Sequence, residues 1–178
     1  MFGPPTFDPP NPSRPFGRAS VDGFDFDFER EIPGMGEFGR ELRRAMGGER
    51  KDGRLLTAAP MCTLPAENSM YNQIQLDMVF VQFYNNPKCH RDWNDWALRK
   101  NTMFAVGLPA SSRAAGSGYV EPNELDNVLR EAKSLGRMGG AMLWDASQAW
   151  SNRKYHTAVK KALDKENLRA GKQVKFCG

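Results

Sequence analysis

The stretch Asp22-Gly23-Phe24-Asp25-Phe26-Asp27-Phe28-Glu29 alternates acidic and aromatic residues. Side chains of a β-strand point alternately to its two faces, so Asp25, Asp27 and Glu29 would form a row of carboxylates opposite the three Phe side chains. An exposed edge strand of an antiparallel sheet would account for this pattern. A strand of a parallel sheet is the alternative, and there both faces are covered. The sequence on either side distinguishes the two.

The flanking sequence favours the parallel sheet, because short apolar runs alternate with stretches of helical period. Strands are predicted at Val21–Phe28, Leu55–Ala59, Met78–Tyr84, Met103–Leu108 and Ala141–Trp144. Helical segments are predicted at Gly36–Met46, near Met70, around Trp93 and Trp96, at Leu125–Leu135 and at Tyr155–Leu168. Strands that are each followed by a helix indicate β/α units and the α/β fold class.

In such a fold the three carboxylates would point into the interior of a sheet or barrel. Burying them costs several kcal/mol per ion unless they share protons and hydrogen bonds, and a cost of that size usually marks a functional site. Among close carboxylates one ionises with difficulty, so Glu29 is expected to have a raised pKa and to act as a general acid. Calcium is disfavoured, because calcium loops of this spacing place turn-forming residues between the acids, whereas here the spacers are Phe.

Charge and hydropathy exclude several classes of function for this chain of 178 residues. The net charge is +4, but residues 151–178 carry +6, which leaves −2 on residues 1–150. A basic last helix without interleaved aromatic residues does not predict nucleic-acid binding. The longest apolar runs, such as Met78-Val79-Phe80-Val81, are far too short to cross a membrane. The first residues also lack the basic and apolar segments of a secretory signal.

The proline distribution sets the domain boundaries. Six of the 12 Pro residues fall in the first 15 positions. We therefore expect a Pro-rich loop over residues 1–17, a single domain over 18–170 and a basic tail over 171–178.

The acidic stretch matches the D-G-x-D-x-D-x-E signature of glycoside hydrolase family 18, and the chain resembles the fungal and plant class III chitinases. Further matching segments follow in the order of that family: Leu56–Pro60, Val81–Pro87, Gly107–Ala110, Ala114–Val120 and Gly139–Trp144. The resemblance extends from about Ser13 to Asp164. It implies a partial (β/α)8 TIM barrel that holds strands four to eight as an open parallel sheet, without strands one to three.

The resemblance also implies an endo-acting hydrolase of β-1,4-linked N-acetylglucosamine that uses a substrate-assisted, retaining mechanism and no cofactor. Glu29 would protonate the glycosidic oxygen. Asp27 would orient the N-acetyl group of the substrate, whose carbonyl oxygen attacks the anomeric carbon, and Asp25 would support Asp27. Chitin or chito-oligosaccharides are the expected partners. Because strands one to three are absent, we expect little activity from this chain alone and self-association through its open sheet edges.

Other residues of the expected site come from the ends of later strands. Tyr84 would hydrogen-bond the acetamido group, and Gln82 lies two positions earlier on the same face. Trp144 would form the apolar floor under the reacting sugar. Further subsite residues are expected at Met61, Tyr119 and Asp145.

The cysteines follow two neighbouring strands. The resemblance pairs Cys62 with Cys89 as a disulfide and implies a secreted protein, whereas a cytosolic location would favour two free thiols. Cys177 has no partner in the chain. A metal site that combines His90 with Cys62 and Cys89 lacks a recognised zinc spacing, so no metal is expected.

Two other functions remain open at this point. One is a non-catalytic carbohydrate-binding or inhibitory protein on the same scaffold, although such relatives usually lose the acid and Glu29 is retained. The other is an endo-N-acetylglucosaminidase that acts on glycoprotein glycans, which shares the acidic motif. The segments around Tyr84 and Gly116-Ser117-Gly118 favour the chitinase.

Overall fold

The computed structural model describes residues 16–48, 53–89 and 92–169. Within them the strands are β1 (Gly23–Phe26), β2 (Leu55–Ala58), β3 (Met78–Gln82), β4 (Met103–Pro109) and β5 (Met138–Trp144). The helices are α1 (Met35–Ala45), α2 (Met70–Gln73), α3 (Trp93–Arg99), α4 (Leu125–Ser134), α5 (Ala146–Ser151) and α6 (Tyr155–Arg169). The predicted alternation of strands and helices is confirmed.

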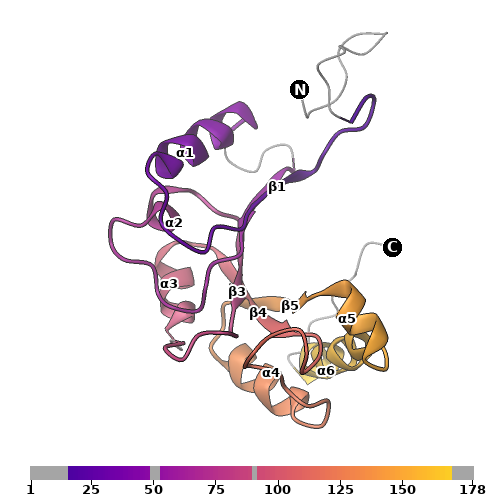
Figure 1. Cartoon of the computed structure of the whole chain (residues 1–178). Coiled ribbons are helices and arrows are strands. Elements are labelled where there is room, and N and C mark those ends of the chain that lie inside the picture. The colour runs from indigo at the N-terminus through magenta and orange to yellow at the C-terminus, as the bar shows by residue number, and fades with distance from the viewer. Residues whose placement is uncertain (1–15, 49–52, 90–91, 170–178) are drawn as a thin grey trace.

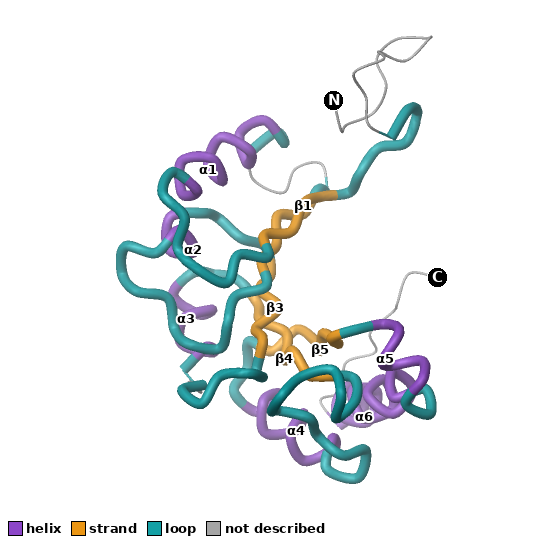
Figure 2. Tube along the Cα trace, viewed as in Figure 1, coloured by secondary structure: helices purple, strands orange, loops and turns teal. Residues whose placement is uncertain are grey.

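The five strands form one sheet in the order β1-β2-β3-β4-β5, and every neighbouring pair is parallel. Figure 1 shows the sheet as a curved arc with the helices on its outer side and with β1 and β5 at its separated ends. The tube view in Figure 2 shows the same open arc. The prediction of an α/β fold with an open parallel sheet is therefore confirmed, and the barrel is not closed.

The hydrophobic core lies between the outer face of the sheet and the helices. Val79 and Val81 of β3 are fully buried there, as is Trp93 of α3, whose indole nitrogen donates to the Cys62 carbonyl at 2.9 Å. Strand alternation directs the other residues of β3 to the inner face. Met78 and Phe80 accordingly remain half-buried on the concave side of the arc.

Strand β1 is shorter than the predicted Val21–Phe28 because its neighbour turns away from it. The Ala59 amide donates to the Phe26 carbonyl at 2.8 Å, but Met61 then bridges to Gln82 of β3. The Phe28 carbonyl accepts the Tyr71 hydroxyl instead of a strand amide. Asp27 and Glu29 therefore lie on the loop that follows β1 at its carboxyl end.

Strand β5 is longer than the predicted Ala141–Trp144 and begins at Met138. Its first residues include Gly139 and Gly140, which have low strand propensity and conceal the strand in the sequence. A Cβ atom on Gly139 would lie 2.9 Å from Met78 Cε and 3.3 Å from Met103 Cβ. Glycine at position 139 thus makes room for two methionine side chains of the inner face.

Helix α5 was not predicted from the sequence. The Asp145 side chain caps it by accepting a hydrogen bond from the Gln148 amide at 3.0 Å. An acidic residue followed three positions later by Gln is a recognised helix-start pattern, but the helix has only six residues, too few for a clear helical period.

Parts of the chain lie outside the described residues. They comprise residues 1–15 of the expected Pro-rich loop, residues 49–52, residues 90–91 with His90, and the expected basic tail with Cys177. None of the described helices has the length and apolarity needed to cross a membrane.

Candidate active site

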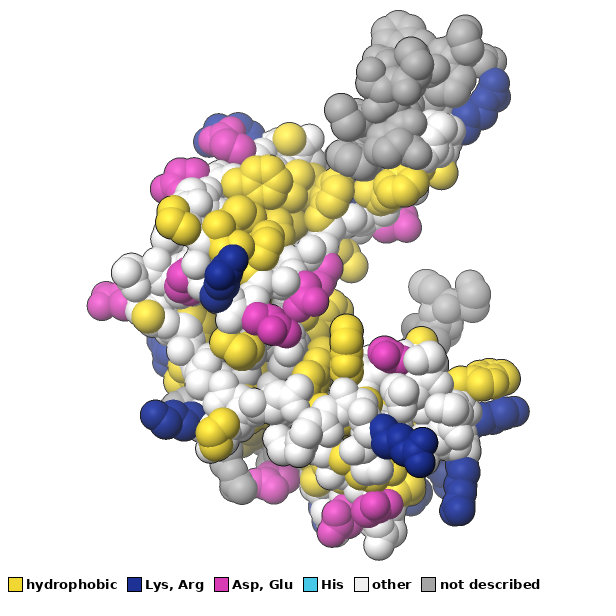
Figure 3. Space-filling view, viewed as in Figure 1, with side chains coloured by type: hydrophobic (Ala, Val, Ile, Leu, Met, Phe, Trp, Pro, Cys, Tyr) yellow, Lys and Arg dark blue, Asp and Glu magenta, His cyan; other side chains and the backbone are white. Residues whose placement is uncertain are grey.

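The carboxylate row lies at the carboxyl end of β1, on the concave side of the sheet. Asp25 pairs in register with Thr57 of β2, and Asp27 and Glu29 follow on the loop. All three side chains are exposed. Figure 3 shows this side of the molecule hollowed between the two limbs of the arc, with acidic side chains beside hydrophobic ones. The expected row therefore exists, but it faces solvent.

Asp25 is the innermost carboxylate of the row. The Thr57 hydroxyl donates a hydrogen bond of 2.5 Å to Asp25 Oδ1. Partial loss of hydration at this position raises the pKa of Asp25, the negative charge of Asp27 raises it further, and the Thr57 hydrogen bond opposes both. A raised pKa is thus found at Asp25, the first carboxylate of the row.

Asp27, on the loop after β1, is connected to β3, which is not adjacent to β1 in the sheet. Gln82, the last residue of β3, donates from Nε2 to Asp27 Oδ1 at 3.1 Å and to the Ala59 carbonyl at 2.9 Å. The Gln82 side chain is buried, with a residue exposure of 7%. Gln82 thereby links the ends of β1, β2 and β3, and it presents an N–H donor to the central carboxylate.

Tyr84 lies two residues beyond β3 and is buried. Burial raises the pKa of Tyr84 to about 12, and the negative charges of Asp27 and Glu29 contribute to the shift. The phenol therefore lies within the electrostatic influence of both carboxylates and keeps its proton throughout the physiological pH range. A protonated phenol can donate a hydrogen bond to a substrate carbonyl.

Glu29 lines a pocket of about 210 Å³ together with Met61, Leu64 and Tyr71. The Tyr71 hydroxyl donates to the Phe28 carbonyl at 2.5 Å, one residue before Glu29. On the other side of Glu29, the Glu31 carboxylate accepts a hydrogen bond from the Met70 amide at 3.1 Å. The short helix α2 therefore holds the loop on both sides of the expected acid.

Sequence reasoning did not identify Tyr71 or Thr57 as site residues. Tyr71 lies in a segment without a recognised motif, and Thr57 lies in the matching segment Leu56–Pro60. Only its partner in space connects each residue to the acidic row. The bridge between Met61 and Gln82 explains why Met61, which was expected at the site, lies beside Glu29.

The other three expected subsite residues are not hydrogen-bonded to the carboxylate row in the described part of the chain. Trp144 ends β5 at the far end of the arc and is 49% exposed. Asp145 caps α5, and hydrogen bonds from Ser147 and from the Gln148 amide lower the pKa of Asp145. Tyr119 accepts a hydrogen bond from Asn152 at 3.0 Å, and its ring packs against that of Tyr155.

Cys62 and Cys89 form a disulfide with Cα atoms 4.8 Å apart, as the resemblance predicted. The bond joins the loops after β2 and β3, which also carry Met61 and Tyr84. No group of three or more His, Cys, Asp or Glu side chains suited to a metal ion occurs among the described residues.

Comparison with known proteins bears on the family of this chain. No family model matches the sequence. The class III chitinase of Arthroderma benhamiae is 35% identical over 193 residues, which cover 94% of this chain and 58% of that protein. The chitinase ICChI of Ipomoea carnea is 32% identical with a TM-score of 0.65, covering 86% of this chain and 60% of its own.

The chain belongs to the class III chitinases of glycoside hydrolase family 18. This chain is also similar to the xylanase-A-amylase inhibitor protein XAIP-III, with 31% identity and a TM-score of 0.72 over 89% of this chain and 64% of that protein. The chain thus spans between one half and two thirds of the length of these relatives.

Proposed function

We propose that the acidic row belongs to an endochitinase-type site that cleaves β-1,4-linked N-acetylglucosamine with retention of configuration. The observation that supports this proposal is the arrangement of Asp27, which lies between Asp25 and Glu29 and accepts a hydrogen bond from Gln82. The negative charges of Asp27 and Glu29 also contribute to the raised pKa of the buried Tyr84 phenol. The Arthroderma benhamiae chitinase shares 35% of its residues over this region.

In the proposed reaction Glu29 donates its proton to the glycosidic oxygen as the bond to the leaving sugar breaks. The carbonyl oxygen of the substrate's N-acetyl group attacks the anomeric carbon, and Asp27 stabilises the positive charge that develops on this group. Water then opens the cyclic intermediate and returns a proton to Glu29. The N-acetyl group of the substrate thus takes the place of the second, nucleophilic carboxylate that most retaining glycosidases use.

Within this proposal Asp25 supports Asp27, and Tyr84 donates a hydrogen bond to the acetamido oxygen. Met61, Tyr119, Trp144 and Asp145 are assigned to sugar subsites. The exposed indole of Trp144 offers an apolar surface of the kind on which a sugar ring stacks.

The test compares two proteins: this chain alone, and this chain joined to the upstream β/α units of a class III relative. The joined protein is expected to release chito-oligosaccharides from chitin. Glu29→Gln should lower its turnover by a factor of about 10³ or more, because proton donation is lost, while oligosaccharide binding stays within a few-fold. Glu41→Gln, which changes an exposed carboxylate on α1, is the matched control. Undiminished turnover in Glu29→Gln would remove this residue from the role.

A second function is favoured by the similarity to XAIP-III. This second candidate is a non-catalytic carbohydrate-binding or inhibitory protein on the same scaffold, and the exposure of the three carboxylates in the open arc is compatible with it. Calorimetric binding of chito-oligosaccharides to the joined protein without release of shorter products would favour this alternative.

We also propose that the protein acts outside the cell. The disulfide between Cys62 and Cys89 supports this location, because such bonds persist in oxidising compartments. Non-reducing peptide mapping of material secreted by its natural source tests the proposal, and free thiols at both positions would contradict it.

A further inference from the structure

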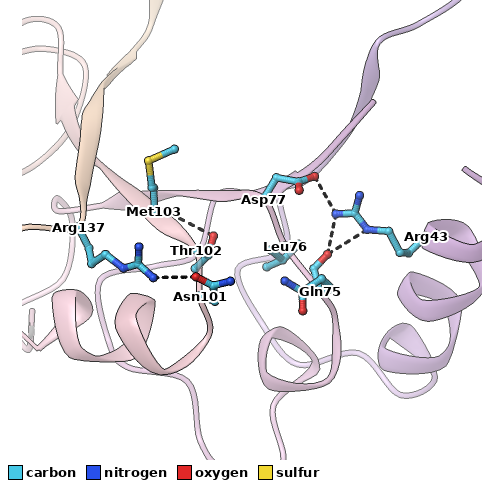
Figure 4. Close-up of a pocket in the computed structure, with 8 residues that line it drawn as sticks. All are labelled: Arg43, Gln75, Leu76, Asp77, Asn101, Thr102, Met103 and Arg137. Atoms are coloured by element: carbon cyan, nitrogen blue, oxygen red, sulfur yellow. Dashed lines mark hydrogen bonds and ion pairs between the residues drawn. The ribbon is translucent and has the colours of Figure 1, made fainter. Parts of the chain in front are cut away.

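A second pocket lies at the opposite end of the sheet, where β3, β4 and β5 begin. It has a volume of about 450 Å³, and Figure 4 shows the residues that line it. Asp77, Thr102 and Arg137 each stand directly before one of these strands, and Arg43 reaches the pocket from α1. The acidic row occupies the other ends of the strands, so this pocket is independent of the proposed function.

One side of the pocket is electrostatically balanced. Arg43 and Asp77 are both buried, and Arg43 Nη2 lies 2.8 Å from Asp77 Oδ2. Arg43 also donates to the Gln75 carbonyl through Nη2 at 2.7 Å and Nε at 3.2 Å. The Asp77 carboxylate accepts a further hydrogen bond from the Leu56 amide at 2.7 Å. This ion pair therefore adds no net charge to the pocket.

The other side carries a positive charge with unused donors. Arg137 donates through Nη2 to the neutral Asn101 Oδ1 at 3.0 Å, and no carboxylate pairs with it among the described residues. Its Nε atom is buried and has no hydrogen-bond partner. A buried donor of a charged group that lacks an acceptor is destabilising, and rotation of the guanidinium toward an anion in the pocket would relieve this cost.

The neighbours of Arg137 in the pocket are also donors. Asn101 uses its amide oxygen for Arg137, which leaves its NH₂ group as the free end of the side chain. The Thr102 hydroxyl, on a residue that is 3% exposed, donates to the Met103 carbonyl only at 3.5 Å, the outer limit of a hydrogen bond. Arg137, Asn101 and Thr102 thus present a cation, an amide and a hydroxyl with no anion between them.

We propose that this pocket binds a small oxyanion, of the carboxylate or phosphate class, through Arg137, Asn101 and Thr102. A planar carboxylate can accept two parallel hydrogen bonds from one guanidinium, whereas phosphate offers a larger charge and a tetrahedral set of oxygens. Because the anion binds only the folded chain, it stabilises the base of the sheet.

The experiment titrates the 178-residue chain with sodium acetate and, separately, with inorganic phosphate, at ionic strength held constant with chloride. Amide chemical shifts and the thermal unfolding temperature are followed. Saturable shifts at Arg137 and Thr102 are expected for at least one anion, together with a rise in the unfolding temperature. The anion that binds more tightly identifies the ligand class.

Arg137→Met should weaken the binding by about tenfold or more, because charge-assisted hydrogen bonds are lost. Arg99→Met removes the same charge from an exposed position on α3 and should leave the affinity unchanged. Asn101→Asp provides a second variant if Arg137→Met does not fold, because it places a carboxylate beside the guanidinium and should compete with the added anion. Equal affinity in the wild type and the folded variants, or no saturable binding in the wild type, would overturn the proposal.

Discussion

Gln82 donates a hydrogen bond to Asp27 over 3.1 Å, although the two residues are 55 positions apart and Asp27 follows β1, which does not neighbour β3 in the sheet. The same amide group donates to the carbonyl of Ala59, the residue directly after the intervening strand β2. One buried side chain therefore determines both where the central carboxylate lies and how the ends of three strands are held together.

Replacing Gln82 tests this relationship. Gln82→Leu removes both hydrogen bonds and leaves the Ala59 carbonyl without its side-chain partner, so the free energy of unfolding should fall by about 1–3 kcal/mol. Gln75→Leu, at an exposed glutamine, should change it by less than about 0.5 kcal/mol. Urea unfolding of the two variants measures the difference, and equal stabilities would show that the Gln82 contacts contribute nothing.

The pKa of Asp25 predicts how stability depends on pH. Since it is raised above the ordinary value of 3.8, the folded chain keeps this proton at pH values where the unfolded chain has lost it. The free energy of unfolding should therefore decrease as pH rises through the interval between the two pKa values. Asp25→Asn should remove this decrease and leave the chain more stable than the wild type at neutral pH.

Urea unfolding of Asp25→Asn and of the wild type across that interval measures the effect. Asp22→Asn, at an exposed carboxylate of the same motif, is the matched control. An unchanged slope in Asp25→Asn would show that Asp25 does not titrate as its surroundings indicate.

The disulfide should make a large contribution to stability. In the chain-entropy treatment, the loop closed between Cys62 and Cys89 corresponds to about 3–4 kcal/mol. The double variant Cys62→Ala and Cys89→Ala should lose an amount of this order, and reduction of the wild type should reproduce most of it. A reduced wild type as stable as the oxidised protein would contradict the prediction.

The open edges of β1 and β5 should cause the chain to associate with itself. Edge strands present unpaired amide and carbonyl groups that pair with other chains. Sedimentation velocity should show an average mass that rises with concentration for this chain, and a monomer for the protein joined to upstream β/α units. A monodisperse, soluble monomer of the isolated chain that hydrolyses chito-oligosaccharides at the rate of complete relatives would refute both this expectation and the expected loss of activity.

Much of the fold follows from the sequence, because strands β2, β3 and β4 are continuous apolar runs and α4 has a clear helical period. The elements that were misjudged are those whose limits depend on neighbours. Strand β1 ends early because Met61 pairs with β3. Strand β5 begins early because Gly139 accommodates Met78 and Met103. No local pattern in the sequence encodes either contact.

In the candidate site, too, residues in a local sequence pattern could be predicted, and residues that depend on distant contacts could not. Asp25, Asp27 and Glu29 could be identified because they lie close together in the chain. Gln82 and Tyr84 could be added because a strand brings them to the same edge of the sheet. Tyr71 could not be found, because its hydroxyl contacts a backbone carbonyl, and any residue type can supply a carbonyl. Asp145 has a structural role that the sequence analysis did not predict, because its side chain caps helix α5.

The hydrogen bond from the Tyr71 hydroxyl to the Phe28 carbonyl affects how the position of Glu29 depends on the rest of the sheet. Glu29 is anchored from α2, in the β/α unit that follows it, and not from the open side of β1. A structural change at the open edge of β1 therefore leaves the hydrogen bonds of Tyr71 and Met70 to this loop intact. The position of Glu29 is therefore set by the β/α unit that follows it in the chain.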